Sequence, residues 1–204
     1  KITHIGENAF NGCALLQDLN LSSLKTIGDG AFKGCSGISS IFIGENVSLP
    51  LDEMFTAEGL NNLKVFEISK NNKHITKIQD KLFSGSNELS DVQLNNISSI
   101  GNSSFEYCYD LSSIDFPDSL NYIGDYCFTN TSLQTVDIPS AVSYIGENAF
   151  YMCEYLSAIN VDDNNPYYYD IDGVLYKHTA NYDLSDIVEM LIDLRDELST
   201  IKGE

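Results

Sequence analysis

Histidine is the side chain whose ordinary pKa lies nearest neutrality, so the three histidines are the first candidates for acid–base chemistry. His4 stands near the N-terminus, His74 in a polar connector and His178 in the C-terminal part of the chain. None belongs to a motif with a serine or cysteine nucleophile, and no glycine-rich phosphate-binding loop accompanies them. We therefore expect solvated histidines, no catalytic residue, no cofactor and no enzymatic activity.

The five cysteines offer a second kind of chemistry, as metal ligands or as disulfides. They lack the C-x-x-C pairs of zinc sites, so we expect no metal centre. Buried unpaired thiols fit better, because free cysteine behaves as a small hydrophobe. A disulfide between Cys13 and Cys35 is the alternative, since the repeat described below would bring their backbones to about 5 Å.

An oxygen-rich segment near the C-terminus is the remaining candidate for cation binding. Its members are Asp162, Asp163, Asn164, Asn165, Asp170 and Asp172. Such oxygens suit calcium, but their spacing matches no EF-hand loop. We interpret the segment as a turn-rich polar loop, because Asp and Asn favour turns; calcium binding is the alternative.

Charge and tyrosine are both unevenly distributed. The formal net charge is −19, which excludes nucleic acid as the expected partner because no basic surface is available for phosphates. No Lys or Arg occurs from residue 82 to 176, and all twelve Tyr lie at or beyond Tyr107. No apolar run approaches the length of a membrane span, and 43% hydrophobic residues are enough for a core.

Exposed tyrosine suits binding surfaces, because it combines apolar area with a polar group. Tyr122 and Tyr144 share one repeat position, and we expect them to point outward and stack between adjacent coils. The candidate binding residues are Tyr107, Tyr109, Tyr122, Tyr126, Tyr144, Tyr151 and Tyr155, with Asp115 and Asp137 on the outward face of the predicted strands. Edge packing with compositional drift is the competing explanation.

A repeated phrase of about 22 residues positions all of these side chains. Residues 5–13 read IGENAFNGC, and residues 27–35 read IGDGAFKGC. One repeat position holds Phe10, Phe32, Phe55, Phe83, Phe105, Phe128 and Phe150, and another holds Cys13, Cys35, Cys108 and Cys153. The third of seven copies carries extra residues before Leu63, and the sixth lacks one residue before Leu133.

Each copy ends in a Leu-x-x-Leu-x-Leu-like stretch, which predicts a very short strand. One such strand cannot bury its apolar side alone, but stacked copies form a parallel sheet with strands about 4.8 Å apart. We expect the recurrent Phe to form a continuous column inside the opposite wall. We expect the Ile-Gly and Gly-Cys glycines to supply backbone conformations that other residues disfavour.

The full phrase, I-x-x-I-G-x-x-A-F-x-G-C-x-x-L-x-x-L-x-L, resembles the BspA-like class of leucine-rich repeat. This resemblance implies a right-handed solenoid of short parallel strands on a secreted or cell-surface protein, and binding rather than catalysis. Residues 162–176, which end in DGVLY, resemble a frequent non-repeat insert of that family.

The chain therefore divides into a solenoid over 1–161, an insert or terminal cap over 162–180 and a helical tail over 181–204. The tail is predicted from apolar residues at three- and four-residue steps within 184–201. We interpret it as a short C-terminal helix that caps the solenoid. A seam for self-association and the edge of a dockerin-like module around residues 183–188 are the alternatives.

Three functions follow from this organisation. The first is a non-enzymatic adhesion module that binds a protein or another host or cell-surface ligand, with tyrosines for contact and the acidic field for steering. The second is a structural spacer that presents another domain. The third is an accessory domain of an extracellular enzyme complex, attached through the dockerin-like tail.

The Phe column yields the first testable expectation. Phe105→Ala should lower the free energy of unfolding by about 3–5 kcal/mol, because it would leave a cavity in a dry, packed column. Urea denaturation of the variant measures this cost. A loss below about 1 kcal/mol would show that Phe105 does not belong to the core.

Overall fold

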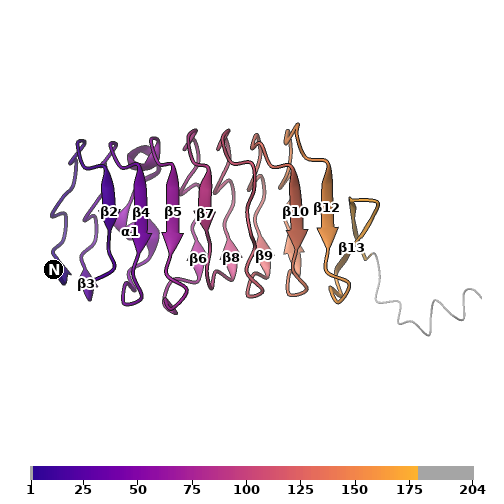
Figure 1. Cartoon of the computed structure of the whole chain (residues 1–204), viewed down its shortest axis with the longest axis horizontal. Coiled ribbons are helices and arrows are strands. Elements are labelled where there is room, and N and C mark those ends of the chain that lie inside the picture. The colour runs from indigo at the N-terminus through magenta and orange to yellow at the C-terminus, as the bar shows by residue number, and fades with distance from the viewer. Residues whose placement is uncertain (1, 179–204) are drawn as a thin grey trace, which may run out of the picture.

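The computed structural model describes residues 2–178, and these form a solenoid of about seven stacked coils (Figure 1). Every coil except the fifth contributes a short strand to one wall, and neighbouring strands within each sheet run parallel in register, as the repeat predicts. These main-wall strands are β2 (Asp18–Asn20), β4 (Ser40–Ile43), β5 (Val65–Ile68), β7 (Asp91–Gln93), β10 (Thr135–Ile138) and β12 (Ala158–Val161).

A second row of two-residue strands follows the bend of each coil, behind the main wall in Figure 1. Its members are β1 (His4–Ile5), β3 (Thr26–Ile27), β6 (Lys77–Ile78), β8 (Ser99–Ile100), β9 (Tyr122–Ile123) and β11 (Tyr144–Ile145). The row is interrupted between β3 and β6, where the irregular third coil contains α1 (Leu51–Met54) and the 3₁₀ turn η1 (Ala57–Leu60). Buried Leu51, Met54 and Leu60 fill the interior of that coil.

The wall around the recurrent Phe, called here the turn wall, is joined by a regular ladder of backbone hydrogen bonds. In the fifth coil the N–H groups of Ser103, Phe105 and Tyr107 donate to carbonyls of the sixth coil at 2.8 to 2.9 Å. In most coils the residues two before and two after the Phe adopt φ values from +52° to +80°. Left-handed residues are therefore a regular part of this wall.

The Phe rings form the core that the spacing predicts, with one correction. Phe32, Phe83, Phe105 and Phe128 are almost fully buried. The rings make two stacks instead of one continuous column: Phe10–Phe32–Phe55, and Phe83–Phe105–Phe128–Phe150. The extra residues of the third coil separate the stacks, and Phe66 of β5 packs against Phe83 at 4.8 Å between ring centroids.

The glycines of the Ile-Gly pairs are required for a different reason from the one predicted. Gly28, Gly101, Gly124 and Gly146 do not adopt positive φ. A Cβ at Gly124 would lie 2.6 Å from the backbone of the preceding coil, and the other three positions are equally close. These glycines therefore permit coils to stack closely, whereas Gly12, Gly34 and Gly85 do have the positive φ expected of them.

The fifth coil breaks the predicted sheet. Ser113, Ile114 and Asp115 alternate outward and inward as expected, but they form no strand, and one isolated bridge links Asp115 to Gln93. β10 consequently pairs with β12 and belongs to a separate sheet. The sixth coil is one residue short before its strand. Unequal coil length does not by itself break the ladder, because β5 pairs in register with β4 and β7 across the longer third coil.

After β12 the chain leaves the repeat as an antiparallel hairpin of β13 (Tyr168–Ile171) and β14 (Val174–Lys177). The hairpin packs on the last coil, where Ile159 donates its N–H to the carbonyl of Gly173 at 2.8 Å. The predicted helix over 184–201 and the dockerin-like residues 183–188 lie outside the described residues. Within the described part, no helix is long and apolar enough to cross a membrane.

Close stacking at the glycines predicts a position-dependent effect of one substitution. Gly124→Ala should destabilise the fold by about 1–3 kcal/mol, because its Cβ would collide with the preceding coil. Gly6→Ala is the matched control: it occupies the same repeat position but has no atom within 4 Å of an added Cβ, so its effect should stay within about 0.5 kcal/mol. Equal urea midpoints for the two variants would contradict this explanation.

Candidate functional site

Three of the cysteines form hydrogen bonds to the preceding coil. All five thiols are free, so the alternative Cys13–Cys35 disulfide is absent. Cys35 donates its Sγ–H to the carbonyl of Phe10 at 3.0 Å, and Cys108 does so to Phe83 at 3.1 Å. Ser86 occupies the same repeat position and donates to Leu60 at 2.9 Å. The position therefore requires a small donor toward the preceding coil.

Burial of these thiols is uneven, which corrects one expectation. Cys35, Cys108 and Cys127 are buried and Cys153 is half-buried, but Cys13 is exposed. Burial raises the pKa of Cys108 from 9.0 to about 12, and raises that of Cys127 well above the ordinary value. Both therefore stay protonated and unreactive near neutral pH.

The three histidines lie far apart along the solenoid and make few side-chain contacts. His4 and His74 are exposed, and the ring of His178 packs against Tyr169 at 4.8 Å between centroids. His4 forms its side-chain hydrogen bond with Thr3, the preceding residue in sequence. Among residues 2–178, no hydrogen bond joins a histidine ring to a serine or cysteine side chain.

The oxygen-rich segment uses its carboxylates in turns. Asp162 accepts the N–H of Asn164 at 2.8 Å, and Asp170 accepts the N–H of Val161 at 2.8 Å. Asn165 is buried and makes four hydrogen bonds to the backbone at 2.8 to 3.0 Å. Within residues 2–178, no group of three His, Cys, Asp or Glu is arranged to hold a metal ion. These contacts support the turn interpretation.

The tyrosine pair on the second row of strands has the predicted geometry. Tyr122 and Tyr144 are register partners in β9 and β11, and their rings stack with centroids 4.8 Å apart and an interplanar angle of 9°. The Tyr144 hydroxyl donates to Asp125 at 3.4 Å, and the Asp125 carboxylate, with a contribution from desolvation, raises the pKa of Tyr144. The pair remains accessible from solvent.

The other predicted tyrosines do not join this pair through ring contacts. Tyr107 and Tyr109 contact each other at 6.1 Å between centroids, and Tyr126, Tyr151 and Tyr155 are exposed individually. No aromatic contact among the described residues links any of them to Tyr122 or Tyr144. The structure therefore separates the predicted residues into a strand pair and a group on the turn wall and its adjacent loops.

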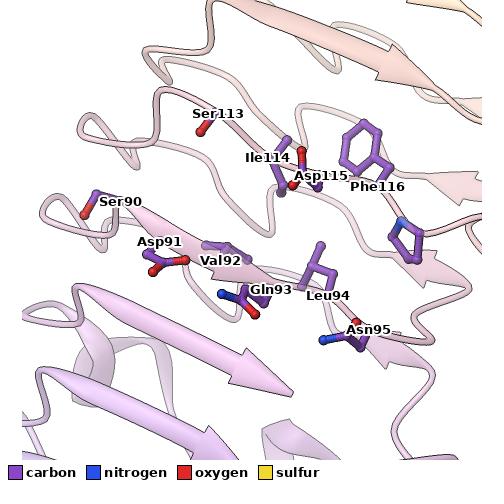
Figure 2. A pocket seen from close by; sticks show the side chains of 11 residues that line it. Ser90, Asp91, Val92, Gln93, Leu94, Asn95, Ser113, Ile114, Asp115 and Phe116 are labelled. Carbon is purple, nitrogen blue, oxygen red and sulfur yellow. The ribbon is translucent and has the colours of Figure 1, made fainter. Parts of the chain in front are cut away.

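The predicted aspartates line two hollows where the main sheet is broken. Figure 2 shows the first, about 440 Å³, between β7 and the segment that carries Ser113 and Asp115. The second, about 400 Å³, lies on the other side of this segment and includes Asp137. Asp137 accepts a hydrogen bond from Asn160 at 2.6 Å. Within residues 2–178, Asp91 and Asp115 have no side-chain hydrogen bond or ion pair, so their carboxylates are open to a cation.

Sequence reasoning missed a polar ladder that supports the turn wall. Asp80 accepts the N–H of Asn102 at 3.0 Å, Asn102 accepts that of Asp125 at 2.9 Å, and Asp125 accepts that of Glu147 at 2.9 Å. The signal was present, because these four residues share one repeat position. Part of the acidic composition therefore serves the backbone, and the charge count alone could not reveal this.

Comparison with known proteins now identifies the repeat. A family model described as "BspA type Leucine rich repeat region (6 copies)" matches residues 1–77 and 76–172. The chain belongs to this family. Because the match covers most of the chain, its leucine-rich repeat character is established independently of the structure. A comparison with curated proteins finds no match.

Two solved structures resemble this BspA-type domain. A leucine-rich cell surface protein from Faecalibacterium prausnitzii A2-165 is 27% identical, with a TM-score of 0.62 over 89% of this chain and 48% of its own. The pneumococcal vaccine antigen PcpA is 22% identical, with a TM-score of 0.65 over 86% of this chain and 47% of its own, and shows the shared fold. This chain thus spans about half the length of each.

A thiol-labelling experiment tests the cysteine geometry of this BspA-type domain. At pH 8, Cys13 should react rapidly with a disulfide reagent, whereas Cys108 and Cys127 should react only when the protein unfolds, because their raised pKa values suppress the thiolate. Denatured, unreduced protein should contain five thiols. Peptide mass analysis assigns the labelled positions, and rapid native labelling of Cys108 would contradict the buried geometry.

Proposed function

We propose that this BspA-type repeat domain is a non-enzymatic adhesion module of a secreted or cell-surface protein, binding a protein or another cell-surface ligand. The observation that carries this proposal is the row of exposed tyrosines on the last three coils. Tyr109, Tyr151 and Tyr155 have more than half of their surface exposed, at 51%, 55% and 66%. Rings that contribute so little to the core are available for contact with a partner.

Charge supports the same conclusion. The interval from residue 82 to 176 contains no Lys or Arg and fourteen Asp or Glu. Asp91 and Asp115 both line the first hollow of the broken sheet, which Figure 2 shows. Such a field accelerates association with a cationic partner and repels an anionic one.

The family relationship supports the surface setting. The Faecalibacterium relative is described as a cell surface protein, and PcpA as a vaccine antigen. Leucine-rich repeat solenoids present extended surfaces without a catalytic centre, which fits the absence of a nucleophile–base pair among the described residues. We place the present domain in the same setting.

The strand pair gives the direct test. Tyr122→Thr with Tyr144→Thr should weaken binding to immobilised matrix proteins or cells at least tenfold, because the paired rings supply apolar contact area. The melting temperature should change little, since the lost stacking is worth about 0.5–1.5 kcal/mol. Thr26 occupies the same position in the second coil, so threonine is compatible with this row.

His4→Thr with Lys77→Thr is the matched control at the same position in the first and fourth coils. It should leave binding unchanged. Unchanged affinity in the tyrosine variant would remove Tyr122 and Tyr144 from the binding surface. Failure of the native domain to adhere to any cell, matrix protein or glycan would favour the structural-spacer alternative.

A further inference from the structure

The left-handed positions of the turn wall are filled differently in the two halves of the solenoid. In the first, second and fourth coils they hold Asn8, Gly12, Gly30, Gly34, Lys81 and Gly85. In the last three coils they hold Ser103, Tyr107, Tyr126, Asn130, Asn148 and Met152. Large apolar or aromatic side chains thus enter these positions only in the last three coils.

Tyr107, Tyr126 and Met152 occupy backbone positions that suit other residues better. A residue other than glycine in the left-handed region costs on the order of 1–3 kcal/mol, and bulky residues are rare there. The three side chains keep 42%, 42% and 48% of their surface exposed, so nearly half of each is open to contact with a partner. Glycine or asparagine, which other coils use, would serve the backbone better. Their presence therefore points to a contact outside this chain.

These three residues lie on one wall and have apolar neighbours. The backbone N–H of Tyr126 donates to the carbonyl of Glu147. Asn130 holds the repeat position of Tyr107 and Met152 in the coil between them, and its N–H donates to the carbonyl of Tyr151 at 3.0 Å. Tyr109 contacts the Tyr107 ring, and Tyr151 directly precedes Met152. We call Tyr107, Tyr126 and Met152, with Tyr109 and Tyr151, the turn patch.

The charge around the turn patch selects one kind of partner. Glu106 and Asp125 directly precede Tyr107 and Tyr126 in the chain, and the last three coils contain no Lys or Arg. A second copy of this chain would bring a second net charge of −19 and is disfavoured. Guanidinium groups suit both the tyrosine rings and the neighbouring carboxylates, because they stack on the former and pair with the latter.

We propose that the turn patch docks an arginine-rich segment of a partner protein, with guanidinium groups on the Tyr107 and Tyr126 rings. This assignment rests on the proposed interaction function and gives it a location and a partner chemistry. The strand pair of Tyr122 and Tyr144 is a separate surface, so the two assignments can fail independently.

The test compares nine-residue arginine and lysine peptides by calorimetry at 150 mM salt. Equal charge cancels the contribution of the acidic field, which leaves the stacking preference for arginine. The native domain should bind the arginine peptide at least fivefold more tightly than the lysine peptide. The patch variant combines Tyr107→Gly, Tyr126→Gly and Met152→Gly. In this variant the ratio of the two affinities should fall below twofold, while the melting temperature stays equal to that of the native domain or rises.

Ser103→Gly, Asn130→Gly, Asn148→Gly is the matched control, because it changes the other left-handed positions of the same coils. It should keep the native ratio. A native ratio below fivefold, a ratio of twofold or more in the patch variant, or an equal loss in the control overturns the proposal. A patch variant that melts below the control also overturns it, because the side chains would then serve folding. Adhesion that persists in the patch variant counts against this site alone.

Discussion

Close backbone contact between successive coils is the constraint on which the rest of this solenoid depends. Gly124 shows how tight it is, since even a methyl group there would overlap the coil before it. The ladder of the turn wall and the Cys108 thiol satisfy backbone groups across the same interface. Repeated short hydrogen bonds join each coil to the next around the stacked phenylalanines. Each coil therefore depends on its neighbours for its hydrogen-bond partners and for the packing of its Phe ring.

This constraint leaves the outward positions open to other uses. Side chains that face solvent contribute little to the stack, so they can vary between coils without cost to the core. The first four coils contain no tyrosine, whereas the last three concentrate tyrosines and carboxylates. A BspA-type solenoid can therefore combine a uniform interior with a local binding surface, and the structure places these side chains on different walls of the same coils.

The buried residues of the core were predictable, but the division of the phenylalanines into two stacks was not, and the surfaces were predictable only in part. Phe83 and Phe105 were assigned to a buried column because their repeat position is constant, and stacking of Tyr122 on Tyr144 followed from the same logic. The break at Ser113–Asp115 was not foreseen, because the fifth copy keeps the regular spacing of the repeat. The role of Asp80 in the polar ladder was missed, since a carboxylate reads as surface charge until its backbone partner is known.

The sequence alone determined the repeat, its parallel strands, the phenylalanine interior and the family, because each depends on spacing within one copy. Only the tertiary structure decided why glycine follows isoleucine, where the sheet is interrupted and which tyrosines meet. Those features arise between copies, where a change of one residue alters the register and the distance between backbones. Periodicity is a local property of the chain, whereas contact across coils depends on how the whole stack aligns.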